Sequence, residues 1–89
     1  MTSALPGEDL IETGLADLAG GVDSVAALLV SIGAPRLRRL GYELPRVIAD
    51  AEHRLYDRLA RENADAAHSR YNALVRRLVS FERAAACVD

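Results

Sequence analysis

The chain has 89 residues, of which 51% are hydrophobic and 27% are charged, and its formal net charge is −2. This composition is typical of one folded globular domain and excludes an intrinsically disordered chain. The sequence contains one cysteine, Cys87. A single thiol cannot build a disulfide framework, which argues against a small disulfide-stabilised secreted domain.

The N-terminal segment, residues 1–7, contains no basic residue and no apolar core of the kind found in signal peptides. The longest uncharged apolar stretch, residues 24–35, is shorter than the roughly 20 residues needed to cross a bilayer. We therefore expect a cytoplasmic protein without a membrane partner. We also expect a single helical domain over residues 1–89, in which residues 1–6 are flexible.

Charge is distributed unevenly along the chain. Residues 1–35 contain five acidic and no basic residues, whereas residues 36–89 contain eleven arginines and eight acidic residues. Opposite charges on the two parts predict attraction between them, either within one chain or between two chains.

Glycine and proline divide the first half of the chain into short segments. The first, residues 7–19, places apolar residues at helical spacing and acidic residues in its first turn. The apolar positions are Ile11, Leu15, Leu18 and Val22. Gly20 and Gly21 are expected to end this helix.

Two further helices are predicted before residue 41. The segment 25–32 is apolar nearly all round, which indicates a central, buried helix, and Asp23 or Ser24 is expected to cap it. Gly33 ends this segment, and Pro35 suits the first turn of a short third helix over residues 35–40.

Residues 46–89 contain neither glycine nor proline and consist mostly of good helix formers. As one helix they would be about 66 Å long. The polar, turn-prone stretch 62–65 favours a helical hairpin instead. No alternation of the β-strand type occurs. The predicted fold class is therefore all-α, a small bundle of four or five helices ending in a long helical hairpin with a long C-terminal helix.

The last predicted helix has the most regular apolar pattern, with spacings of three and four residues that are typical of helix packing. Its members are Ala64, Ala67, Tyr71, Leu74, Leu78, Phe81 and Ala85. We expect this face and residues 25–32 to form most of the core. Any part of the 71–81 seam left exposed is a candidate contact surface for another chain.

Two groups of arginines lie on the predicted hairpin. In the first helix, Arg54, Arg58 and Arg61 have acidic residues four positions away, so we expect a self-neutralised solvent face. The last helix carries four arginines with only Glu82 nearby, and these form the candidate binding surface. They are Arg70, Arg76, Arg77 and Arg83. Such a surface suits an acidic protein partner or, as an alternative, nucleic acid phosphate.

Arg61, six residues and then His68, with Tyr71 three residues further on, resembles the Arg-x(4–6)-His motif of HEPN-domain ribonucleases. That resemblance implies a dimeric helical ribonuclease or toxin–antitoxin component. In such an enzyme the histidine would transfer protons and the arginine would hold the scissile phosphate. The sequence departs from the common form of the motif, which places tyrosine two residues after the histidine.

Two histidines and one distant thiol do not make a metal-ligand set, and no phosphate-binding glycine loop or nucleophile–base grouping occurs. We therefore expect no metal and no cofactor. The sequence favours a non-enzymatic helical module for protein–protein interaction or dimerisation. The ribonuclease and nucleic-acid-binding interpretations stay open as alternatives.

Overall fold

The computed structural model describes residues 5–87 and is built from α-helices joined by turns and one longer loop, with no strand in that range. The helices are α1 (Glu8–Ala19), α2 (Val25–Ile32), α3 (Ala34–Arg39), α4 (Ala51–Glu62) and α5 (Ala67–Ala86). The predicted all-α fold with a long C-terminal helix is confirmed. The helix bounds agree with the sequence prediction to within one residue for the first three helices.

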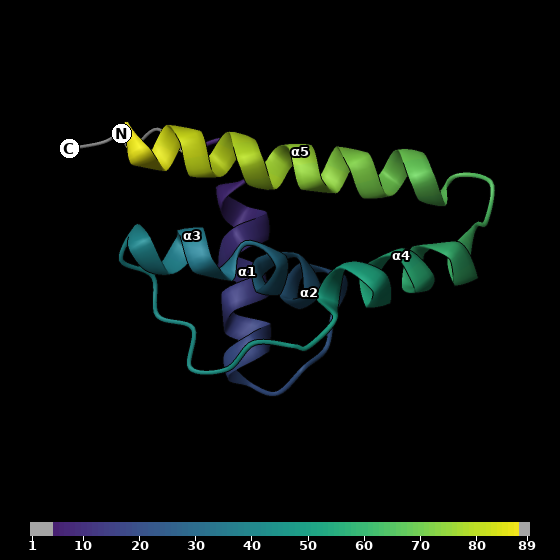
Figure 1. Ribbon diagram of the computed structural model, residues 1–89, viewed down its shortest axis with the longest axis horizontal. Coiled ribbons are helices and arrows are strands. Elements are labelled where there is room, and N and C mark those ends of the chain that lie inside the picture. The colour runs from purple at the N-terminus through teal and green to yellow at the C-terminus, as the bar shows by residue number, and fades with distance from the viewer. Residues whose placement is uncertain (1–4, 88–89) are drawn as a thin grey trace.

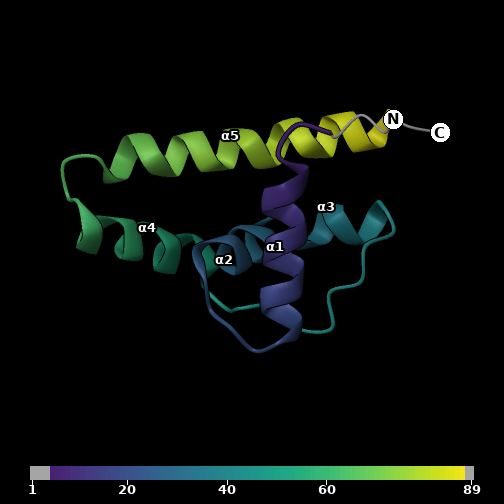
Figure 2. The ribbon, with the colours of Figure 1, turned by 180° about the vertical axis from the view of Figure 1, so that it is seen from behind.

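The short helix α2 lies at the centre of the molecule. Figure 1 shows α5 along one side, above α3 at one end and α4 at the other, with α2 between them. Figure 2, seen from behind, shows α1 crossing α2 at a steep angle. Ala27, Leu29 and Val30 of α2 are completely buried, as expected for a helix that is apolar nearly all round.

The start of α2 is fixed by the side chain of Ser24. Its Oγ accepts a hydrogen bond from the Ala27 amide at 3.1 Å and donates one to Asp17 Oδ2 at 2.7 Å. The cap satisfies one of the free amides of the first turn, and the second bond ties that turn to α1. Of the two predicted caps, Ser24 and Asp23, the serine performs this role.

The hairpin predicted for the second half of the chain is confirmed. It turns between Glu62 and Ala67, where the Asn63 side chain accepts hydrogen bonds from the amides of Asp65 and Ala66 at 3.1 and 3.2 Å. Leu59 is fully buried on α4, as is Ala67 on the other side of the turn. Because the chain folds back here, its radius of gyration is 12.9 Å. This value is close to the about 12 Å expected for a compact domain of this length.

One part of the prediction for the second half is wrong, because the helix does not begin at residue 46. Residues 40–50 form a loop, and α4 starts at Ala51 after Asp50, whose φ of 57° is left-handed. Tertiary contacts override helix propensity in this loop. Leu44 and Ile48 are buried, and Arg46 Nε donates to the Leu18 carbonyl at 2.9 Å.

The core also differs in part from the prediction. Leu78 and Phe81 of α5 are buried, but Ala64 lies exposed in the turn, and Val22, predicted on the α1 face, is 52% exposed. Buried residues from α1, α4 and the 40–50 loop complete the core. They are Ile11, Leu18, Leu44, Ile48, Ala51, Leu55 and Leu59. The turn at Gly20 and Gly21 ends α1 before Val22 can join its apolar face.

Among residues 5–87, no helix combines the length and the apolar character needed to cross a membrane.

Candidate functional site

The four arginines predicted as a binding surface on α5 fall into two pairs. Arg70 forms an ion pair with Glu62 at 2.8 Å, and Arg77 lies 3.8 Å from Asp9 of α1. The second contact is an instance of the predicted attraction between the acidic and basic parts of the chain. The Arg70–Glu62 and Arg77–Asp9 ion pairs are both solvent-exposed, so they add little to the stability of the fold.

Arg76 and Arg83 form the other pair. Both are exposed, and neither has an acidic partner within 4.0 Å among the described residues. Together with Asn72, Val75, Val79 and Ser80 they line a shallow hollow of about 340 Å³ on the outer side of α5. Their positive charge is therefore available to a partner.

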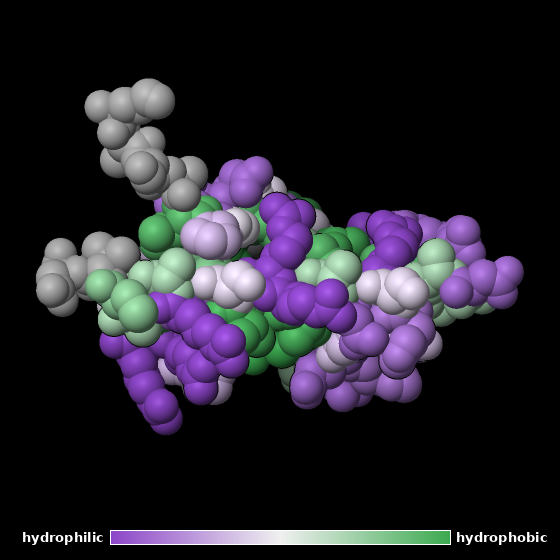
Figure 3. All heavy atoms as spheres, turned by 90° about the horizontal axis from the view of Figure 1, so that it is seen from above, coloured by the Kyte–Doolittle hydropathy of each residue, from purple (hydrophilic) through white to green (hydrophobic). Residues whose placement is uncertain are grey.

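A second hollow, of about 400 Å³, lies between α5 and the junction of α2 with α3. We call it the α3–α5 groove. Its lining residues are Ile32, Gly33, Pro35, Arg36, Arg39, Val75, Leu78, Val79 and Glu82. It shares Val75 and Val79 with the hollow beside Arg76, so the two form one continuous surface. Figure 3 looks down on α5 and shows hydrophobic side chains in the middle of the molecule, partly overlaid by hydrophilic ones.

Glu82 lies in the wall of this groove. Its residue surface is only 5% exposed, and its nearest cationic partner is Arg36, with Nη1 4.0 Å from Oε1. No described residue donates a hydrogen bond to this carboxylate. Every fully enclosed side-chain oxygen and nitrogen in the described range has a hydrogen-bond partner. Because the Glu82 oxygens have no hydrogen-bond partner, they are not among the fully enclosed atoms. They therefore stay open to the groove that Glu82 lines.

Gly33 provides the room that the Glu82 carboxylate occupies. A Cβ atom on Gly33 would lie 2.8 Å from Glu82 Oε2 and 2.9 Å from Leu78 Cδ1. The backbone at Gly33 has a φ of −88°, which any residue can adopt. A side chain at position 33 would therefore have to displace the ends of the Glu82 and Leu78 side chains, whereas the backbone conformation would not oppose it.

Burial raises the pKa of Glu82 above its ordinary value, and the opposing effect of the Arg36 charge is smaller. A carboxylate in this situation lacks the hydrogen bonds that would normally compensate for lost water. Glu82 is therefore a buried polar side chain of the groove without a hydrogen-bond donor among the described residues.

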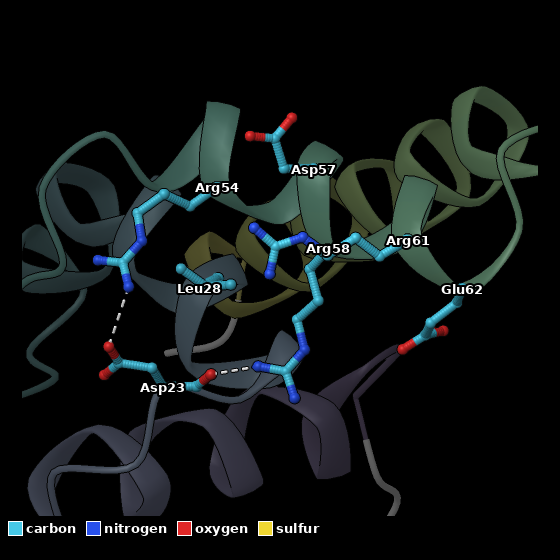
Figure 4. Close-up of a pocket in the computed structure, with 7 residues that line it drawn as sticks. All are labelled: Asp23, Leu28, Arg54, Asp57, Arg58, Arg61 and Glu62. Atoms are coloured by element: carbon cyan, nitrogen blue, oxygen red, sulfur yellow. Dashed lines mark hydrogen bonds and ion pairs between the residues drawn. The ribbon is translucent and has the colours of Figure 1, made fainter.

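A third hollow, of about 470 Å³, lies between α4 and the start of α2 and is lined by Asp23, Leu28, Arg54, Asp57, Arg58, Arg61 and Glu62. Figure 4 shows Asp23 facing the arginines across it. The Asp23 carboxylate pairs with Arg46 and Arg54, each at 3.2 Å, and its carbonyl accepts from Arg58. Three acidic and three basic side chains line this hollow, so their charges balance.

The predicted ion pairs within α4 are replaced by contacts with other partners. Arg54 binds Asp23 and not Asp50, Asp57 lies 3.2 Å from His53, and Glu62 binds Arg70. The reason is geometric. Asp23 lies just before α2 with its carboxylate 3.2 Å from Arg54, and no acidic residue of α4 comes within 4.0 Å of that arginine among the described residues.

The residues of the ribonuclease resemblance lie on both arms of the hairpin. Arg61 lines the hollow beside Asp23, and the lining of that hollow does not include His68. His68 is exposed and lies 3.2 Å from Asn72. Tyr71 packs against Tyr56 with ring centroids 5.7 Å apart, and burial raises its pKa, as does Glu52. Within residues 5–87, then, no hydrogen bond or ion pair joins the three side chains into one constellation.

Glu82, Arg36 and Arg39 line the groove but were not among the predicted binding residues, and Glu82 was considered only as a neighbour of the α5 arginines. A signal for it exists, because Glu82 follows Leu78 by four residues and Val75 by seven, and so falls on the buried side of α5. A single acidic residue on an otherwise apolar face is the pattern that marks such a position.

The metal prediction concerns the His, Cys, Asp and Glu side chains of the whole chain. In the described range no three of these side chains are grouped in a way that could hold a metal ion.

No protein-family model matches the chain, and comparisons with curated proteins and with solved structures also find no match. Functional inference for this protein therefore depends on the geometry described above.

Proposed function

We propose that this protein is a non-enzymatic helical interaction module that binds a protein partner through the outer surface of α3 and α5. The observation that carries the proposal is the continuous surface formed by the α3–α5 groove and the hollow beside it. Four arginines line this surface together with one acidic residue, Glu82, around half-buried valines. An apolar centre with a charged rim is the usual composition of a protein interface.

The charge of this surface favours a different protein over a second copy of the chain. A symmetric dimer through this surface would bring like-charged arginines together, because the same patch meets itself across a two-fold axis. Like charges in contact oppose association. An acidic partner has no such penalty, and its encounter with the arginines would be accelerated.

Site-specific crosslinking in the cells that naturally express the protein tests this proposal. A photo-crosslinking amino acid in place of Arg76 is expected to give a covalent adduct with a different protein. The same replacement at Glu12, which is exposed on α1, is the control and should not give that adduct. Arg83→Glu, combined with the crosslinker at position 76, should abolish it.

An adduct formed equally at both positions, or none at position 76, would overturn the proposal. Nucleic acid binding is the main alternative for the same surface. It would appear as crosslinking to RNA or DNA, with an affinity for a purified oligonucleotide that falls steeply with salt.

A further inference from the structure

We infer that the α3–α5 groove is a docking site for an acidic amphipathic helix of the partner protein, and that Glu82 accepts a hydrogen bond from a neutral donor on that helix. This inference rests on the proposed function and adds the site, the chemistry of the ligand and a specificity-determining residue.

The shape of the groove suits a helix. Its walls are two helices, α3 and the C-terminal half of α5, which run near each other in Figure 1. The α5 wall from Val75 to Glu82 covers two helical turns, or about 10 Å at 1.5 Å per residue. Amphipathic helices dock in such grooves by placing side chains spaced three or four residues apart between the walls.

The groove offers an apolar floor for the buried face of that helix. Ile32, Val75 and Val79 are all half-buried, so their remaining apolar surface would be covered by a ligand. The hollow of about 400 Å³ lies in the size range of ligand-binding clefts in proteins.

The positive charge at the rim of the groove determines which residues are favoured on either side of the buried face of the ligand helix. Arg36 is 60% exposed at its side chain, and Arg39 is exposed on the same short helix. Arg76 and Arg83 continue the positive rim beyond the valines. Guanidinium groups bind carboxylates in a bidentate manner, which favours Asp and Glu on the exposed face of the docked helix.

Glu82 selects the residue at the centre of the contact. Glu82 is only 5% exposed as a residue, and its carboxylate opens to the groove and receives no hydrogen bond from the described residues. A docked N–H or O–H group would supply the missing bond, and a purely apolar side chain would leave the carboxylate buried and unsatisfied. A cationic donor is disfavoured, because Arg36 lies 4.0 Å from the same carboxylate. A tyrosine, tryptophan, asparagine or glutamine therefore fits this position best.

The experiment selects helical peptides from a displayed random library against the immobilised full-length chain and measures their affinities by fluorescence polarisation. The selected peptides are expected to be acidic and to share one neutral donor. Arg39→Glu should weaken their binding at least tenfold, whereas Arg61→Glu, the same charge change at an exposed arginine outside the groove, should leave it within twofold.

Two further comparisons test the role of Glu82. Glu82→Leu should weaken a selected peptide about tenfold, but should have little effect on the same peptide with its donor replaced by leucine. Glu82→Gln keeps one acceptor oxygen and should retain part of the affinity. Circular dichroism of every variant verifies that the helices are intact.

The outcomes separate this inference from the proposed function. Peptides that respond to Arg76→Glu but not to Arg39→Glu would overturn the groove site and leave the interaction module standing. Peptides whose affinity changes with neither substitution, or a selection that yields no groove-dependent binder, would overturn the groove inference. If crosslinking in cells also gave no adduct at position 76, the proposed interaction module would be overturned as well. Equal effects of Glu82→Leu on both members of a peptide pair would overturn the hydrogen bond.

Discussion

The Ser31 hydroxyl of α2 joins the central helix to the loop that precedes α4. Its Oγ accepts a hydrogen bond from the Ile48 amide at 3.1 Å and donates to the Ala27 carbonyl at 2.9 Å. Ser31 is 5% exposed and Ile48 is 6% exposed, so both bonds are shielded from water. This pair holds residues 46–50 against the core in place of the helix that their composition favours.

Ser31→Ala is expected to lower the free energy of unfolding by about 1–3 kcal/mol, because the Ile48 amide would stay buried without an acceptor. Urea unfolding followed by circular dichroism measures the loss. Ser69→Ala, at an exposed position of α5, is the control and should change stability by less than about 0.5 kcal/mol. Equal effects of the two substitutions would show that the Ser31 contact contributes nothing.

Gly14→Ala tests the close approach of α1 and α2. A Cβ atom at Gly14 would lie 2.3 Å from the Ala26 carbonyl oxygen and 2.8 Å from Val30 Cγ1, so the two helices must separate. Such overpacking costs about 1–3 kcal/mol and exceeds the roughly 1 kcal/mol that alanine gains as a helix former. We expect a lower midpoint of thermal unfolding. Gly20→Ala meets nothing closer than 3.5 Å and should leave the midpoint nearly unchanged.

The buried carboxylate of Glu82 predicts a specific pH dependence of stability. Because burial raises the pKa of Glu82 in the folded state, the folded protein binds more protons than the unfolded chain between the two pKa values. The contribution of Glu82 to the free energy of unfolding therefore falls as the pH rises through this window, from the ordinary glutamate value upward.

Glu82→Gln removes this titration. The variant is expected to gain stability relative to the wild type as the pH increases from 4 to 7, when both are compared by urea unfolding. Glu12→Gln, at an exposed acidic residue, is the matched control. A constant difference between wild type and Glu82→Gln over this range would contradict the prediction.

The ribonuclease alternative predicts cleavage of RNA, whereas the interaction module predicts none. If the protein is the non-enzymatic module proposed above, purified protein should not cleave single-stranded RNA above the level of a mock purification. Cleavage that disappears in both His68→Ala and Arg61→Ala would establish the alternative. His68 is exposed, so His68→Ala should keep the wild-type stability.

The solution mass tests whether the arginine surface meets a second copy. Light scattering on a size-exclusion column is expected to give the monomer mass of 9.6 kDa at low salt. Salt screens the repulsion between arginines, so any self-association through the valines should appear only at high salt. A stable dimer at low salt would favour self-association and argue against a distinct acidic partner.

The sequence by itself determined the order of the helices and the bounds of the first three to within one residue, but not where α4 begins. Residues 25–32 are apolar nearly all round and bounded by Ser24 and Gly33, a pattern that indicates a short buried helix. The polar stretch around Asn63 placed the hairpin turn correctly, because its side chain can satisfy the amides of a tight turn locally. These features depend on neighbours in sequence, which is why a pattern reveals them.

Only the tertiary structure decided the loop at 40–50, the partners of the arginines and the environment of Glu82. Composition favoured helix at residues 46–50, but Ile48 binds Ser31 and Arg46 binds the Leu18 carbonyl, and these long-range contacts outweigh a weak local preference. Likewise, Arg54 could meet an acid on its own helix, yet Asp23 reaches it from the start of α2. Burial of Glu82 beneath Gly33 needs the two chain segments to meet in space, and no local spacing can express that contact.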